Sequence, residues 1–168
     1  MPLLLKDNKP VEDSWTEVAA IEELPEAGPA IVPLDLWKEH RETLLARNAP
    51  VGVRLKSDQP PKEIADDLEH ISLIALEFPK FTDGRAYSYA RLLRERHGFQ
   101  GELRAVGNVL QDQAIFMVRC GFDAFEVDEK TAQAWQDALA RLTHVYQPAA
   151  DGRTAAPWLR HRRRQAAE

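Results

Sequence analysis

The chain has 168 residues, of which 44% are hydrophobic and 29% charged, and its formal net charge is -5. These values are typical of a soluble globular protein with one sizeable core. Apolar stretches such as 71–76 are far shorter than the roughly 18 residues that span a bilayer, and the first residues lack the basic region and long apolar core of a signal peptide. We therefore expect a cytoplasmic protein without a membrane partner. The only cysteine, Cys120, excludes an internal disulfide, a Cys-x-x-Cys pair and a Cys-ligated cluster formed by this chain alone.

Charge divides the chain into two predicted parts. Residues 147–168 carry five arginines against Asp151 and Glu168, so this part is basic while residues 1–146 are acidic. The segment also contains Pro148 and Gly152 and few large apolar side chains, which favours a flexible basic tail after a single domain over 1–146. We expect truncation after Gln147 to leave folding unchanged. Trp158 and the arginines that follow it are candidates for a tether to an acidic partner, with a solvated end as the alternative.

The elements are predicted in chain order from apolar runs and turn signals. The polar link 6–10 between two short apolar stretches predicts a small N-terminal hairpin. Five apolar runs then predict strands, each followed by a helix: 30–34, 50–55, 71–78, 102–106 and 124–127.

The helices have start and stop signals of their own. Asp35 is expected to cap the first helix, and Pro60 and Pro61 suit the first turn of the second. Gly98 and Gly121 are expected to end the third and fourth helices in a left-handed conformation. After Asp128, the fifth helix has apolar residues at helical spacing, which predicts one buried stripe: Ala132, Trp135, Leu139, Leu142 and Tyr146.

Strands that alternate with helices predict an α/β fold with a mainly parallel sheet of about five strands. The continuous apolar run Leu73 to Leu76 supports strands that are covered on both faces. An open sheet with helices on both sides is the first expectation. The alternative is a partial (β/α) barrel, because eight strand–helix units usually need about 250 residues.

Ligands of such sheets bind beyond the carboxyl ends of the strands, and the segment 77–88 passes through that edge. Lys80 and Arg85 lie beside a helix start that follows Asp83 and Gly84, which predicts an oxyanion site for sulfate, sulfite or phosphate. In the structural alternative, Asp83 is only a helix cap and Arg85 only pairs with Glu77 or Asp112.

The segment 101–113 repeats this geometry at the next strand and adds Arg104, Asn108, Asp112 and Gln113 to the candidate anion site. Arg104 interrupts an apolar strand, so an internal ion pair with Glu126 or Asp112 is the competing interpretation. Glycine spacing matches neither a dinucleotide-binding motif nor a P-loop, so no nucleotide cofactor is expected.

Three other groups of residues receive structural interpretations. Cys120 ends a helix, where the dipole disfavours a thiolate, and is expected to be a buried structural thiol. The five histidines have no metal-ligand spacing. Glu77, Glu126 and Asp128 are candidates for a magnesium site, but paired or solvated carboxylates are favoured, so no metal is expected.

Four segments of the chain carry a family resemblance: 78–85, with Pro79-Lys80-Phe81-Thr82-Asp83-Gly84-Arg85, then 90–94, 101–113 and 119–125. They resemble an uncharacterised bacterial family that is labelled as a probable oxidoreductase of sulfite reduction. The resemblance extends from Val11 to the fifth helix. The family commonly has Asp where this chain has Asn108, and the basic tail is not part of its pattern.

The resemblance implies a role in cysteine biosynthesis beside sulfite reductase or phosphoadenylylsulfate reductase, which would be the partners. Because the residues provide no dinucleotide loop or thiol pair, we expect an accessory or anion-binding role in sulfite reduction. The alternative is a small-molecule enzyme that acts on an anionic substrate at the strand ends. Nucleic acid is not expected as a partner, because the acidic body would repel phosphate.

Overall fold

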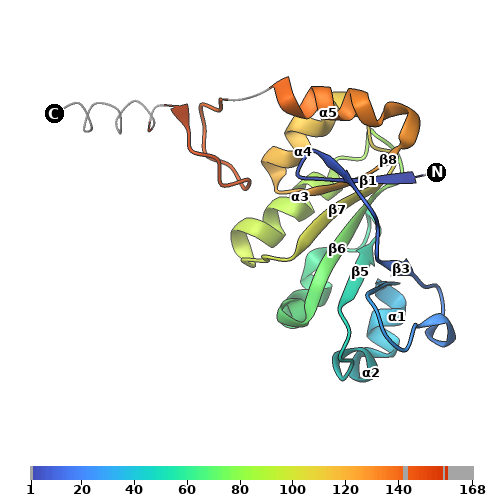
Figure 1. The fold of residues 1–168 in the computed structure, drawn as a ribbon. Coiled ribbons are helices and arrows are strands. Elements are labelled where there is room, and N and C mark those ends of the chain that lie inside the picture. Colours follow the sequence, from blue (N-terminus) through green and yellow to red (C-terminus); the bar gives the residue numbers. More distant parts are fainter. Residues whose placement is uncertain (1, 142–143, 157, 159–168) are drawn as a thin grey trace.

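The computed structural model describes residues 2–141, 144–156 and 158, which form one curved sheet with helices packed against it (Figure 1). The eight strands found in this part of the chain follow the order β2-β1-β8-β7-β6-β5-β4-β3. They are β1 (Pro2–Lys6), β2 (Lys9–Val11), β3 (Thr16–Glu17), β4 (Ala30–Pro33), β5 (Val51–Leu55), β6 (Ile71–Phe78), β7 (Glu102–Gly107) and β8 (Ala124–Asp128).

Helical segments connect the strands from β4 onward. The α-helices are α1 (Leu34–Glu39), α2 (Arg41–Leu45), α3 (Arg85–Arg91), α4 (Ala114–Cys120) and α5 (Ala132–Arg141). The 3-10 helices are η1 (Ile21–Glu23), η2 (Pro61–His70), η4 (Gln111–Gln113) and η5 (Glu129–Thr131), and the π-helical turn η3 (Leu92–Arg96) extends α3. No helix in the described ranges is long and apolar enough to cross a membrane.

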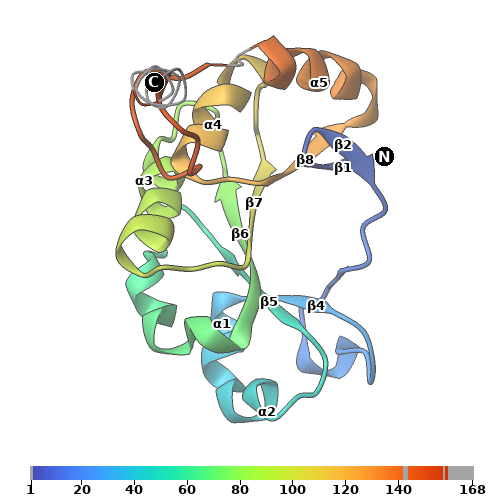
Figure 2. The ribbon, with the colours of Figure 1, turned by 60° about the vertical axis from the view of Figure 1, so that its left-hand side comes forward.

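Strands β3 to β8 are parallel, and each pairs with the next one along the chain. Because parallel crossovers are almost always right-handed, this order places the connecting helices on one face of the sheet. Figure 2 shows α1, α3 and α4 on one side of the strands and the chain from the hairpin to β3 on the other. The expectation of helices on both faces is therefore wrong, and the alternative of a partial barrel fits the curled sheet.

All five predicted strands form within one residue of their predicted bounds. The two-residue strand β3 was not predicted, because Thr16 and Glu17 give no apolar signal. The N-terminal hairpin is confirmed, and β1 pairs antiparallel with both β2 and β8. Its turn is tighter than the predicted link, since Asp7 and Asn8 alone have positive φ values of 50° and 61°, as in a type I′ turn.

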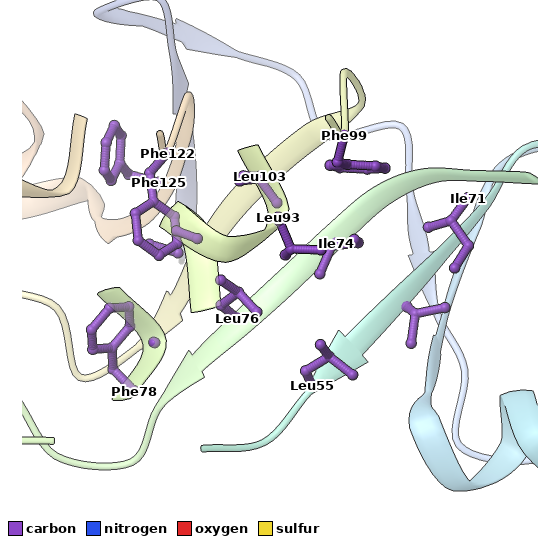
Figure 3. Packing of buried hydrophobic residues seen from close by; sticks show 14 of the residues in the cluster. Leu55, Ile71, Ile74, Leu76, Phe78, Leu93, Phe99, Leu103, Phe122 and Phe125 are labelled. Carbon is purple, nitrogen blue, oxygen red and sulfur yellow. The ribbon is translucent and has the colours of Figure 1, made fainter. Parts of the chain in front are cut away.

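The main core lies between the sheet and the helices (Figure 3). Alternate residues of β6, namely Ile74, Leu76 and Phe78, point toward Leu93 of η3 and the aromatic residues of the neighbouring strands and loops. All three are nearly inaccessible to solvent. Burial on this face explains why the strands were recognisable as apolar runs.

The helix ends differ from the predictions in places. Helix α1 begins at Leu34 after Pro33, and Asp35 lies in its first turn without capping it. The predicted first helix is divided at His40 into α1 and α2. Gly98 and Gly121 do have the expected positive φ. In the fifth helix Trp135 is buried, but Tyr146 is 74% exposed and lies beyond the helix. Leu142 lies outside the described residues.

Candidate functional site

The carboxyl ends of β5 and β6 form a shared rim with two loops, 56–60 and 79–84. Arg85 at the start of α3 links these loops, because its Nη2 donates to Oγ of Ser57 at 2.9 Å. The hydroxyl of Tyr89 donates to the backbone oxygen of Ser57, also at 2.9 Å. The structure thus brings Lys80, Asp83 and Arg85 together with Ser57, which the sequence analysis did not select.

The carboxylate of Asp83 already holds the start of α3. It accepts hydrogen bonds from the backbone N–H of Arg85 at 3.2 Å and from its guanidinium at 3.0 and 2.6 Å. The Arg85 guanidinium, through these hydrogen bonds, holds the pKa of Asp83 well below its usual range. The partner of Arg85 is therefore Asp83, not Glu77 or Asp112. An incoming anion would have to compete with this internal carboxylate.

Two lysines of the rim have no such partner among the residues that the structure describes. Lys56 follows β5 and Lys80 follows β6, and both side chains are exposed. Among the described residues, no carboxylate forms an ion pair with either ammonium group. Because β5 and β6 are parallel neighbours, the two lysines provide uncompensated positive charge at the same edge of the sheet.

A pocket of ≈ 250 Å³ opens beside this rim on the face of the sheet away from the helices. Arg54 lies in its wall and donates to Glu17 at 3.0 Å and to Glu77 at 3.2 Å. Lys56 completes the charged part of the lining, while Val18, Ile31 and Pro33 supply apolar surface. The pocket therefore combines two cations, two carboxylates and an apolar wall.

Arg104 differs from the cations of the rim because it is buried and already paired with two carboxylates. Its side chain is 2% exposed, and its guanidinium donates to Asp13 at 2.6 Å and to Glu102 at 3.0 Å. The internal ion pair expected as the alternative is present, but its partners are Asp13 and Glu102 rather than Glu126 or Asp112. Both carboxylates raise the pKa of Arg104 against the lowering effect of burial.

The remaining predicted residues lie around the ends of β7 and α4. Asn108 is exposed, and its backbone N–H donates to the oxygen of Phe78 at 2.7 Å. Asp112 is exposed on η4, while Gln113 accepts a hydrogen bond from the hydroxyl of Tyr87 at 2.9 Å. Burial raises the pKa of Tyr87 to about 12, so this phenol remains a hydrogen-bond donor. These residues follow β7, the neighbour of β6, and so border the rim.

The three carboxylates proposed for magnesium have separate environments. Glu77 pairs with Arg54, and Asp128 accepts from the backbone N–H of Lys130 as the cap of η5. In the part of the chain that the structure describes, no three His, Cys, Asp or Glu side chains are arranged to hold a metal ion. Burial raises the pKa of Glu126, and this side chain has no ion pair with a described residue.

Cys120 is a buried free thiol at the end of α4. Burial raises its pKa, which keeps the sulfur protonated and weakly nucleophilic. The neighbouring Gly121 adopts the left-handed conformation, with φ of 107°. These features support the structural interpretation of the thiol.

A larger cavity of ≈ 680 Å³ lies at the opposite edge of the sheet, between the N-terminal turn and residues 150–153. Arg94 lies in its wall and donates to the backbone oxygens of Gly121, Phe99 and Gly101 and to the Asp123 carboxylate. Every one of these acceptors lies at the start of β7 or β8 or in the loop before it. Arg94 therefore holds the bottom of the sheet together and is a structural residue.

The fold and the rim define a half-barrel α/β protein with a small charged pocket at the carboxyl edge of its sheet. Residues 52–157 match the family described as a bacterial protein of unknown function (DUF934), and the chain belongs to this family. The matched range contains Arg54, the rim loops and Arg104. A search of curated proteins found no match.

Proposed function

We propose that this protein binds a small oxyanion between the loops that follow β5 and β6, as an accessory protein of sulfite or sulfate reduction. The observation that carries the anion site is the pair Lys56 and Lys80, whose charges have no carboxylate partner in the described structure. Ser57 follows Lys56 in the chain and links its loop to Arg85, from which its hydroxyl accepts a hydrogen bond. A sulfate-like ligand offers several oxygens to such donors.

The accessory role is supported by the chain's limited thiol chemistry. Its only cysteine is buried at a helix end with a raised pKa. The chain therefore offers no accessible thiol of its own to carry electrons. The link to sulfite reduction comes from the family resemblance described above, and sulfite reductase and phosphoadenylylsulfate reductase are the partners it suggests.

A second candidate is an enzyme that acts on an anionic small molecule at the same edge. Glu126 favours this alternative, because it faces away from the helices, forms no ion pair with a described residue, and has a pKa that burial raises. A carboxyl group whose pKa is raised by burial is a candidate for proton transfer. Loss of turnover in Glu126→Gln, with anion binding retained, would favour the enzyme over the accessory protein.

Calorimetric titration with sulfite, sulfate and phosphate tests the rim site. We expect binding by the unmodified protein at millimolar anion and its loss in the double variant Lys56→Ala/Lys80→Ala. Lys9→Ala is the matched control, because Lys9 is an exposed lysine of β2 near the opposite edge. Undiminished binding by the double variant would reject the site.

Co-purification tests the accessory role separately. Tagged protein should retain sulfite reductase or phosphoadenylylsulfate reductase from a native extract, and Cys120→Ser should retain them equally well. If neither enzyme is enriched over a tag-only control, the accessory role fails while the anion site remains open to the titration.

A further inference from the structure

The face of the sheet away from the helices has a small buried apolar floor, and one floor residue, Ala75, has an arginine on each neighbouring strand. Strand register places Arg54 opposite Ala75 of β6, and Ala75 opposite Arg104 of β7. The floor consists of Ile31, Leu73, Ala75 and Val106, all of them buried. In this register row, only the small side chain of Ala75 stands between the two arginines.

A short segment of the same chain covers this floor. Residues 12–15, which we call the strap, connect β2 to β3 without forming a helix or strand. Figure 2 shows this connection crossing the side of the sheet opposite to the helices. Trp15 is partly buried and packs against this apolar cluster, and the Asp13 carboxylate accepts from the Arg104 guanidinium at 2.6 and 3.2 Å.

The strap therefore places one aromatic ring and one carboxylate on the sheet. The Arg104 side chain is 2% exposed, whereas the Asp13 side chain is 39% exposed. In this ion pair the arginine of the sheet is therefore buried, and the carboxylate of the strap is partly open to solvent. Glu102 is shared between Arg104 and Lys6. Without Asp13, two cations would face one carboxylate at this point, and a buried charge would lack full compensation.

We propose that the strap is a displaceable occupant of a binding site for an aromatic carboxylate or sulfonate. The ligand's anionic group would replace Asp13 on Arg104, and its ring would replace Trp15 on the floor of Ile31, Leu73, Ala75 and Val106. This site goes beyond the proposed function, because it lies on the body of the sheet and uses neither Lys56 nor Lys80.

Competition between strap and ligand follows from the shared contacts. The strap leaves Arg104 only when another anion compensates its charge, so opening and ligand binding are coupled. If the strap is closed in about nine molecules of ten or more, the apparent affinity of the ligand falls at least about tenfold below that of the open site.

Calorimetric titration of the full chain with 1-naphthoate tests the proposal. We expect Asp13→Ala/Trp15→Ala to bind 1-naphthoate at least about tenfold more tightly than the unmodified protein. The matched control is Glu12→Ala/Trp158→Ala, which removes an exposed acid and an exposed indole without opening the strap. Its affinity for 1-naphthoate should equal that of the unmodified protein.

Two further probes test which parts of the ligand are needed, one without the negative charge and one without the ring. The uncharged 1-naphthamide and the ring-free acetate should each bind the open variant much more weakly than 1-naphthoate. Equal binding of 1-naphthamide would mean an apolar surface without an anion site and would overturn the proposal. Unchanged 1-naphthoate affinity in the open variant would overturn it as well.

Variants keep the test independent of folding defects and of the rim. If the double strap variant does not fold, Asp13→Asn replaces it, because this change keeps the side-chain size and removes only the charge. Asp13→Asn should bind 1-naphthoate more tightly than the unmodified protein does. Equal affinity of the two proteins would reject the proposal that the strap competes with the ligand. Binding of 1-naphthoate should persist in Lys56→Ala/Lys80→Ala. Its loss there would assign the ligand to the rim instead.

Discussion

Arg119 of α4 donates two hydrogen bonds to the carboxylate of Asp151, at 2.7 and 2.9 Å, and the two side chains are 16% and 5% exposed. The guanidinium also donates to the backbone oxygen of Gln147. Ala155 is buried, and the N–H of Ala156 donates to the oxygen of Val145 at 2.6 Å. Residues 147–156 therefore contact the body. The arginines from 160 to 164 lie outside the described residues, so the tether stays a prediction.

Truncation after Gln147 is now expected to destabilise the protein, contrary to the expectation from sequence. The simplest test is Asp151→Ala, which leaves the Arg119 guanidinium half-buried without its carboxylate. We expect the free energy of unfolding to fall by about 2 kcal/mol, below the value for a fully buried pair because Arg119 keeps some solvent contact. Urea denaturation measures it. The exposed control Asp137→Ala should change stability by less than about 0.5 kcal/mol.

Removal of Arg94 should be the most damaging single change at the bottom of the sheet. Arg94→Ala removes the guanidinium donor of three backbone oxygens and leaves the Asp123 carboxylate with only the Leu103 N–H, so we expect a loss of about 3–5 kcal/mol. Arg96→Ala, an exposed arginine of the same helical turn, is the control and should be nearly neutral. Equal denaturation midpoints for the two variants would show that the Arg94 contacts do not stabilise the fold.

The Arg94 variant should also become more sensitive to pH. Burial raises the pKa of Asp123 above its ordinary value of 3.8, and Arg94 opposes this rise. A carboxyl group with a raised folded pKa favours folding most at low pH, and that contribution is lost as pH rises through the folded pKa. Because Arg94→Ala removes the opposing charge, its stability deficit should grow between about pH 4 and pH 7. Thermal melting across this range measures the trend, and a pH-independent deficit would contradict it.

Glu126→Gln should make the protein slightly more stable near neutral pH. Burial raises the pKa of Glu126 above its ordinary value of 4.5, so ionisation of the folded protein is disfavoured and stability declines as pH rises through the folded pKa. Glutamine removes this penalty, but the gain should stay under about 1 kcal/mol because the side chain remains partly solvated. Melting temperatures near pH 7 should rise, whereas those near pH 4 should not. A loss of stability at both pH values would indicate an ionised, paired Glu126.

Cys120 should react slowly with thiol reagents in the folded protein. Its sulfur is buried and its pKa is raised by burial, so both access and thiolate population are low. A chromogenic disulfide reagent should modify the native thiol at least about a hundredfold more slowly than the thiol of urea-unfolded protein. Rapid native modification would indicate that α4 opens easily.

Sequence reasoning located the strands because β4, β6 and β7 bury apolar side chains on both faces, which makes their apolar runs continuous. It could not provide strand order, since apolar runs contain no information on which strands are neighbours. At the candidate site it selected Lys80, Asp83 and Arg85, which do lie together, because turn residues between a strand and a helix are a local signal.

Contacts between distant segments were missed. Asp13 and Arg104 are 91 positions apart, and no local pattern connects them. Arg54 gave a usable signal that was not followed, since it is a charged residue inside an apolar strand, as Arg104 is. Such a residue indicates a face of the sheet with partners or a ligand, and the structure places both arginines on the same face.

The order of the strands also has a consequence for how the chain folds during synthesis. From β3 to β8, each strand finds its neighbour in the unit made just before it, so the sheet can grow as residues leave the ribosome. Strand β1 is the exception, because Leu5 pairs with Phe125 and must wait for almost the whole domain. The N-terminal hairpin is therefore synthesised long before the strand it pairs with, so the apolar side chains of β1 stay without their sheet partner until β8 has been made, and during that time they are open to aggregation or chaperone binding.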